Sequence, residues 1–252
     1  MKRTPWVNRE YEYTLAGQRR QATNAGRVAV IGVLVSAVLL VAWVVSAFLG
    51  GGDTEGGAAT GQPAVAGEPA LPEQDPSGQR TREDADWLTG APAGLVWHSV
   101  GGLALPFGSA DGPRDIDAEA GTAKGYSQTP QGAALAAYQI GSRIALGPSA
   151  ALAAVVDEQT VFDAAAATDV KTNRGDPDPA ALDGTSHPSA FKVLAFLPSQ
   201  ATVQYAMPNP MNGSYNSYQF TVVWVDGDWK LVAPNDTASA KALPGIDGFT
   251  PF

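Results

Sequence analysis

The feature that most constrains this chain is an uncharged apolar run, VAVIGVLVSAVLLVAWVVSAFL, at residues 28–49. Its 22 residues would span about 33 Å as a helix, which matches a bilayer core of about 30 Å. Six cations and two acids precede the run, whereas the first charges beyond it are Asp53 and Glu55. The positive-inside rule therefore predicts a single-pass protein of the cell membrane, with residues 1–27 as a basic cytoplasmic tail and the rest extracytoplasmic.

A cleaved signal peptide is the competing interpretation of this run, because Val45-Ser46-Ala47 has small residues where cleavage could occur. The preceding charged region is very long, however, and the run exceeds the roughly 7–15 apolar residues that are typical of a signal peptide. We therefore expect an uncleaved transmembrane helix that contacts the lipid bilayer. Within it, Gly32 and Ser36 form a small-xxx-small pair that can seat a partner helix.

Composition excludes several classes of function. The chain has no Cys, which rules out disulfides, cysteine zinc sites and iron–sulfur clusters. Its only histidines are His98 and His187, too few for a multi-histidine metal centre. The formal net charge of −9 argues against direct sequence-specific nucleic-acid binding, which needs cationic surface. We expect no metal, no cofactor and no catalytic residue.

The chain beyond the apolar run has parts that differ in composition. Residues 50–86 are dominated by Gly, Ala, Pro, Glu and Gln, and such a segment cannot offset the entropy cost of folding. We expect a disordered tether there, either a plain spacer or a tail that binds a partner. From Trp87 on, the chain has enough apolar residues for a domain, which we place at 87–235 and which a C-terminal tail follows at 236–252.

Local signals predict two Ala-rich helices in this domain. Thr129 can cap a helix with Pro130 at its first position, and GAALAAYQIGSRIAL continues that helix as far as Gly147-Pro148. Ser149 can cap a second helix that runs to about Ala167. The alanines allow close approach, so both helices should pack against a flat surface.

Strand signals lie on both sides of these helices. Segment 93–107 is typical of an edge strand interrupted by Gly101-Gly102, and four antiparallel strands are predicted after the helices, at 190–197, 201–207, 215–225 and 228–233. Asp226-Gly227 favours a two-residue type I′ turn, because both central residues need a positive φ. That register pairs Trp224 with Trp229 and Val222 with Leu231. The prediction is an α+β fold with the helices over one face of the sheet.

Candidate functional residues are few. The acids between Asp111 and Glu119 lack the twelve-residue pattern of a calcium loop, and the paired carboxylates elsewhere fall in segments typical of solvated surface. Segment 207–218, MPNPMNGSYNSY, combines Tyr, Met and Asn in a way that is typical of protein contacts, with packing on the sheet as the alternative. The candidate contact residues are Tyr138, Met211, Tyr215 and Tyr218.

Three segments resemble membrane proteins of actinobacterial conjugative elements: GYSQTPQGAALAAYQI (125–140), LALPFGSADGP (103–113) and VVWVDGDWKLV (222–232). The order of basic tail, anchor, tether and helix-then-sheet domain also resembles the bitopic scaffold subunits of conjugative type IV secretion systems. That resemblance implies an extracytoplasmic domain like nuclear transport factor two, a cone of helices on a curved antiparallel sheet. It also implies that the domain does no chemistry.

We therefore expect a non-enzymatic scaffold subunit of a conjugative DNA-transfer apparatus. Its partners would be other membrane or secretion-system subunits, with further copies of the chain as a second candidate. The alternative is an envelope accessory module that binds lipid, peptidoglycan or a transported ligand. An enzyme on this fold would need an inward-facing carboxylate on the sheet, but Phe220, Val222, Trp224 and Leu231, which we place on that face, are apolar.

Overall fold

The computed structural model describes residues 71–177, 187–209, 211–233 and 241–252. These residues form an α+β fold whose strand pairs are antiparallel. The helices are α3 (Pro130–Leu146), α4 (Ser149–Gln159) and α5 (Ala164–Asn173), with a short 3-10 helix, η1 (Pro76–Gly78). The strands are β1 (Val96–Val100), β2 (Leu103–Phe107), β3 (Asp115–Asp117), β4 (Thr122–Lys124), β5 (Ala190–Leu197), β6 (Gln200–Asn209), β7 (Ser214–Val225), β8 (Asp228–Leu231), β9 (Lys241–Leu243) and β10 (Thr250–Pro251).

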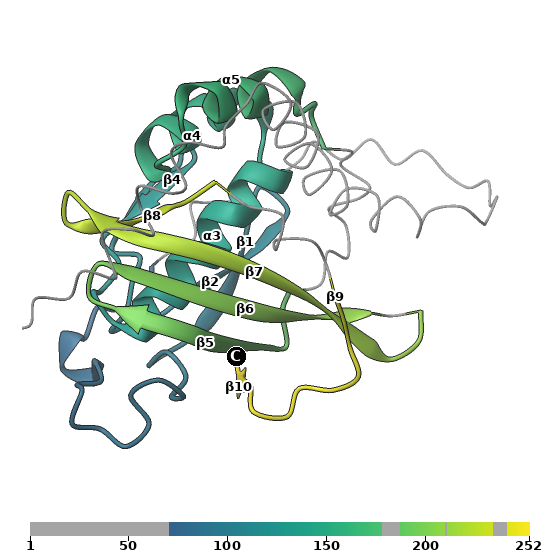
Figure 1. Ribbon diagram of the computed structural model, residues 1–252. Coiled ribbons are helices and arrows are strands. Elements are labelled where there is room, and N and C mark those ends of the chain that lie inside the picture. The colour runs from purple at the N-terminus through teal and green to yellow at the C-terminus, as the bar shows by residue number, and fades with distance from the viewer. Residues whose placement is uncertain (1–70, 178–186, 210, 234–240) are drawn as a thin grey trace, which may run out of the picture.

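One large sheet and two small hairpins make up the β structure. The six-stranded sheet has the order β10-β5-β6-β7-β8, and β9 pairs with the first part of β7. Four of its strands, β5 to β8, follow one another along the chain and in the sheet, as the sequence predicts (Figure 1). The pairs β1-β2 and β3-β4 form separate two-stranded sheets.

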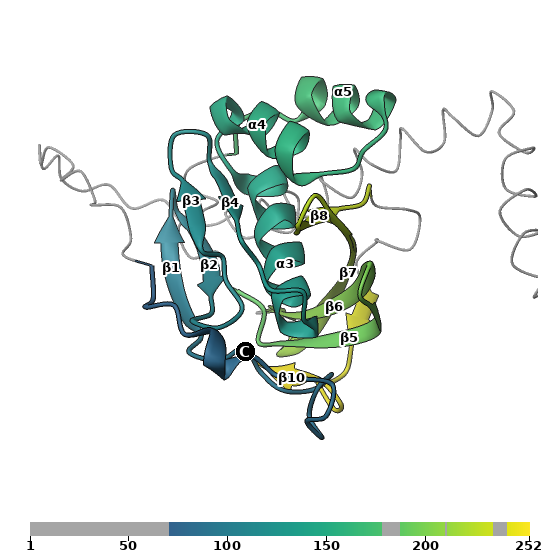
Figure 2. The ribbon, with the colours of Figure 1, turned by 90° about the vertical axis from the view of Figure 1, so that its left-hand side faces the viewer.

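Helix α3 lies between the large sheet and the β1-β2 hairpin (Figure 2). Fifteen of its seventeen residues are buried, which is the pattern of a helix enclosed on all sides rather than of an amphipathic surface helix. Helices α4 and α5 continue from its C-terminal end. The helix is therefore the centre of the fold, and both β layers pack on it.

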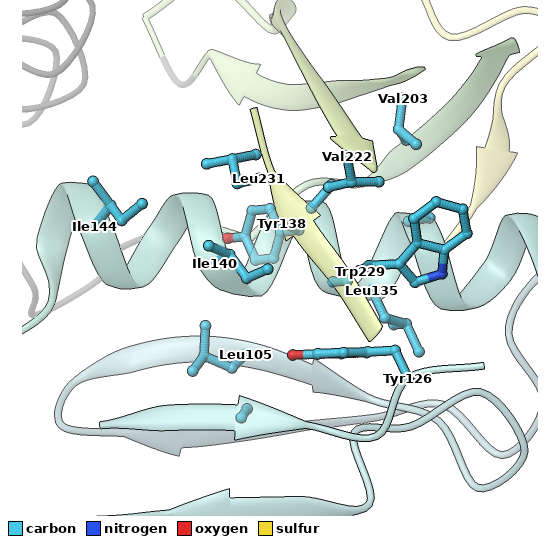
Figure 3. Close-up of a cluster of buried hydrophobic side chains, with 14 of the residues drawn as sticks. Leu105, Tyr126, Leu135, Tyr138, Ile140, Ile144, Val203, Val222, Trp229 and Leu231 are labelled. Atoms are coloured by element: carbon cyan, nitrogen blue, oxygen red, sulfur yellow. The ribbon is translucent and has the colours of Figure 1, made fainter. Parts of the chain in front are cut away.

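Apolar side chains from both layers meet α3. Figure 3 shows Leu135 and Ile140 of α3 with Val222 and Leu231 of the sheet, and Leu105 of the β1-β2 hairpin on the other side. Small residues permit this close packing: a Cβ added at Gly141 would lie 3.0 Å from the Phe220 ring.

The Asp226-Gly227 hairpin is confirmed. Both residues have positive φ, 55° and 83°, and the pairs Trp224–Trp229 and Val222–Leu231 lie in the predicted register. The two Trp rings pack edge-to-face with centroids 5.1 Å apart.

The predicted start and end of α3 are also confirmed. The Thr129 hydroxyl accepts a hydrogen bond from the Gly132 N–H, Pro130 is the first helical residue, and the helix ends before Gly147. The predicted cap of the next helix is wrong by one residue, because Ser149 is the first helical residue of α4 and Pro148 precedes it.

Two other local predictions are wrong. Segment 93–107 is not one interrupted strand: Gly101 and Gly102 both have positive φ and turn the chain back, so β1 and β2 pair with each other. The helix expected from Ser149 to about Ala167 is two helices. Thr160 leaves the helical path to bridge to Leu231 of β8, and Asp163 then caps α5.

The folded region extends past both predicted boundaries. Residues 71–86, which we expected within the tether, contact the domain, since Leu71 packs on the core and the Asp75 N–H donates to the Ser109 carbonyl. At the other end, the expected C-terminal tail contributes β9 and β10, and Phe252 packs against Phe191.

None of the helices in the described residues is long and apolar enough to span a membrane. The predicted span at 28–49, with Gly32 and Ser36, lies outside those residues, as do the predicted cytoplasmic tail and residues 50–70 of the predicted tether.

Replacing Gly227 with Val should lower the free energy of unfolding by about 1–3 kcal/mol, because a β-branched residue is strained at a φ of 83°. Urea unfolding of both proteins measures the difference. Gly245→Val is the matched control, since that glycine also has open space around its Cβ position but no positive φ. Equal stability of the two variants would contradict the role of the turn.

Candidate protein-contact surface

The structure places Tyr138 in the core and not on a contact surface. This α3 residue is only 8% exposed, and its ring centroid lies 5.6 Å from that of Tyr205 and 5.9 Å from that of Trp97. Burial raises the pKa of its hydroxyl to about 12. Its prediction as a contact residue is therefore corrected: the aromatic character that suggested an interface serves packing inside the domain.

The other three candidates lie on the β6-β7 hairpin but not in one patch. Met211 is in the turn and is 77% exposed. Tyr215 and Tyr218 belong to β7 and, three residues apart, face opposite sides of the sheet. Tyr218 pairs with Tyr205 on the side of α3, and burial raises the pKa of its hydroxyl. Met211 and Tyr215 remain the accessible pair at this end.

A different apolar surface gathers at the edge strand β5. Leu194 and Leu197 are 45% and 62% exposed, and Leu88 is 44% exposed. Leu88 is brought near this strand by its neighbour Trp87, whose ring packs edge-to-face on Phe196 with centroids 5.6 Å apart. We call Leu88, Leu194 and Leu197 the β5-edge patch.

Sequence reasoning missed this patch. The run VLAFL (193–197) has the continuous apolar character of a strand covered on both faces, and nothing local indicates that β5 lies at the edge. A β-bulge between Val193 and Ala195 also shifts the alternation of side chains, which turns Phe196 inward and Leu197 outward. Only the exposed apolar side chains in the fold reveal the surface.

The buried carboxylates anchor α3. Asp111, considered above as a calcium ligand, is buried, and its Oδ1 accepts hydrogen bonds from the Ser127 hydroxyl at 2.7 Å and the Thr129 hydroxyl at 2.8 Å. Asp115 and Asp117 are exposed on β3. Among the described residues, no three His, Asp or Glu side chains converge in a way that could hold a metal ion.

Asp228 ties the closing hairpin to the segment before α3. Its carboxylate accepts hydrogen bonds from the backbone N–H groups of Gly125 at 2.8 Å and Tyr126 at 3.3 Å. Burial raises the pKa of this carboxyl, and the N–H donors oppose that effect. The Trp229 indole N–H donates to the Ser127 carbonyl at 2.8 Å. The VDGDW segment is thus held in place by its own polar groups.

A buried polar layer lies between α3 and the β hairpins. The Arg143 guanidinium donates to the Gly121 carbonyl at 2.8 Å and to Gln139 Oε1 at 3.1 Å, and Gln139 in turn donates to the Pro106 carbonyl at 2.7 Å. Burial lowers the pKa of Arg143. The Tyr126 hydroxyl is buried in the same layer without a hydrogen-bond partner among the described residues. These groups join elements of the fold to one another.

The two histidines are separate and have different surroundings. His98 packs edge-to-face on Phe107 with ring centroids 5.2 Å apart, whereas the exposed His187 stacks on Trp97 at 4.2 Å. Neither ring has a recorded hydrogen bond to a serine or a carboxylate, so the described residues do not assemble a Ser-His-Asp arrangement.

Residues 61–251 match a family described as a domain of unknown function, DUF8175. The chain belongs to this family. No curated protein and no solved structure gave a match. The family region begins ten residues before Leu71, the first described residue, and ends at Pro251 in β10. The DUF8175 domain therefore includes the N-terminal segment, β9 and β10, and agrees with the boundaries of the fold better than the predicted range 87–235 does.

The tyrosines of the DUF8175 core offer a matched test of its polar contacts. Tyr205→Phe should lower the free energy of unfolding by about 1 kcal/mol, because the Tyr205 hydroxyl donates to the Ala134 carbonyl at 2.6 Å. Tyr126→Phe should be neutral or stabilising, because it removes a buried hydroxyl that has no partner. Urea unfolding of both variants measures the two free energies of unfolding. A larger decrease for Tyr126→Phe than for Tyr205→Phe would contradict these hydrogen-bond assignments.

Proposed function

We propose that this chain is a membrane-anchored, non-enzymatic scaffold subunit of a conjugative DNA-transfer apparatus. Its DUF8175 domain acts outside the membrane through contacts with other membrane or secretion-system subunits. The observation that carries the proposal is the exposed apolar β5-edge patch, on a domain in which Asp111 and the half-buried Asp228 accept hydrogen bonds from the domain's own O–H and N–H groups. Surface contact is the activity that such an arrangement supports best.

The charge pattern supports the anchored topology. The uncharged run at 28–49 follows a segment with six cations, whereas the residues beyond Gly50 carry 23 acids against 10 cations. Acidic residues contribute little to orientation, so the basic tail decides it, and the tail stays on the cytoplasmic side. The acidic domain is then extracytoplasmic.

The arrangement of elements supports the finer fold assignment. We infer a domain like nuclear transport factor two, in which helices precede a meander of antiparallel strands and pack on one of its faces. Helix α3 does this across β5 to β8, and α4 and α5 follow it along the chain (Figure 2). In such cones the inner face of the sheet is where a ligand or substrate binds. Here Leu135, Tyr138 and Ile140 of α3 are packed into the core on that side, which favours a role at the outer surface.

The topology can be tested by labelling, because the natural chain contains no Cys. A Met211→Cys variant should react with a membrane-impermeant maleimide in intact cells, since Met211 is 77% exposed on the domain. Thr4→Cys, in the basic tail, should react only after the membrane is permeabilised. Labelling of Thr4→Cys in intact cells would contradict the proposed orientation.

The partners can be tested by purifying the full-length protein from its native membrane in mild detergent. We expect the other membrane-spanning subunits of a transfer apparatus and its ATPase to be recovered by mass spectrometry. The control is a tagged fragment, residues 1–60, which retains the anchor but lacks the family region. Recovery of the chain alone would contradict the scaffold role, and recovery of lipid or wall fragments would support the binding-module alternative.

A further inference from the structure

The six-stranded sheet has one closed and one open edge. At β8 the edge is closed by the chain itself, where Thr160 bridges to Leu231 and the Val161 N–H donates to the Leu231 carbonyl at 2.9 Å. On the outer side of β5, the described strand β10 pairs with Ala190 and Phe191 alone. From Lys192 to Leu197 no described strand lies on the outer side of β5. Backbone groups along an open edge can pair with an added strand.

The residues along this open edge lack two of the usual protections against strand pairing, charged side chains and Pro. Natural edges carry charged residues or Pro, but 193–197 has neither. Lys192 is the only charge on β5, and its ammonium lies over the Phe249 ring, 5.7 Å from the centroid. Leu194, at the bulge between Val193 and Ala195, is 45% exposed. The open edge therefore combines unpaired backbone with an exposed apolar patch.

We propose that this edge pairs with β5 of a second copy of the chain, in antiparallel orientation about a two-fold axis. The pairing would join two six-stranded sheets into one and bring Leu194 and Leu197 of the two copies side by side on its outer face. In a two-fold contact the same surface of both copies meets, so that surface must be complementary to itself. An uncharged apolar strand meets that condition.

Charge limits where a second copy can approach and in which orientation. The acidic domains of two copies repel one another over most of their surface, as the exposed Asp115 and Asp117 of β3 illustrate. Along 193–197 there is no charge to repel. Antiparallel pairing also places the two Lys192 residues at opposite ends of the junction, about 20 Å apart, which is beyond the roughly 8 Å screening length at physiological salt. A parallel pairing would put them side by side.

The absence of Cys in the natural chain makes a cross-linking test specific. Single-Cys variants at 194, 195 and 197 of the full-length protein would be oxidised in the membrane and separated on non-reducing gels. We expect a disulfide-linked dimer of twice the chain mass, with a yield that peaks at the position nearest the two-fold axis, because a disulfide needs a Cβ–Cβ distance of about 4 Å. Met211→Cys is the control, since it is more exposed but lies away from this edge.

Substitutions that add charge to the edge provide a second test of the β5 pairing. Leu194→Lys and Leu197→Lys are each introduced into the Ala195→Cys variant. They change exposed side chains, so the fold should persist. The yield of cross-linked dimer should fall at least tenfold, because like charges then meet along the edge. Met211→Lys is the matched substitution that should leave it unchanged. Raising NaCl from 50 to 500 mM should increase the yield, because salt screens the repulsion between acidic domains.

Equal cross-linking at 195 and 211 would overturn the proposal, as would no dimer at any edge position. A cross-linked product whose mass differs from twice the chain would replace the second copy with another protein. The inference goes beyond the proposed function and does not depend on it. If edge-specific dimers form but no transfer subunits co-purify, only the scaffold role in the transfer apparatus fails.

Discussion

The enclosure of α3 is the constraint on which the rest of this fold depends. Packing a helix between two β layers requires small side chains at the close contacts and satisfied polar groups where the helix is not apolar. Five alanines and two glycines of Pro130–Leu146 meet the first need. Gln131, Gln139 and Arg143 meet most of the second by donating to backbone carbonyls of neighbouring segments, while Gln131 Oε1 and Arg143 Nε have no partner among the described residues. Each buried polar side chain thereby holds a loop or strand against the helix.

This arrangement explains the structural role of two carboxylates of the domain. Asp111 and Asp228, which could serve chemistry in a different setting, instead fix the segment from Gly125 to Thr129 just before α3. A carboxylate bonded to the protein's own N–H and O–H groups is held in one geometry, which stabilises the fold. Under our proposals, the interior holds α3 in place and interaction with other molecules takes place at the surface.

The edge of β5 and the end of the β6-β7 hairpin are the two surfaces that fit such a role. They lie in different parts of the large sheet, so a domain of this kind can contact two partners at once (Figure 1). Under our proposals the β5 edge joins two copies, while the hairpin with Met211 and Tyr215 is free for another subunit. A membrane anchor raises the local concentration of copies, which favours a contact that is weak in solution.

What the sequence determined by itself was local. The Thr129-Pro130 start of α3, its end before Gly147, and the Asp226-Gly227 turn with its register all follow from the backbone preferences of a few adjacent residues. The succession of helices and a four-stranded meander, and hence the α+β class, follows from the periodicity of apolar residues. These features need no information from distant parts of the chain.

Only the tertiary structure decided which surfaces are covered. Tyr138 and Met211 are equally plausible contact residues in the sequence, yet α3 carries one into the core and the hairpin turn carries the other outward. The apolar run of β5 is typical of a central strand, but the short β10 pairs with Ala190 and Phe191 alone and leaves the rest of β5 at an edge among the described strands. Likewise, β9 and β10 are too short to show a pattern and exist because β7 and β5 offer free backbone groups. Burial and strand order depend on pairings between residues far apart in the chain, and the local preferences of a segment do not determine those pairings.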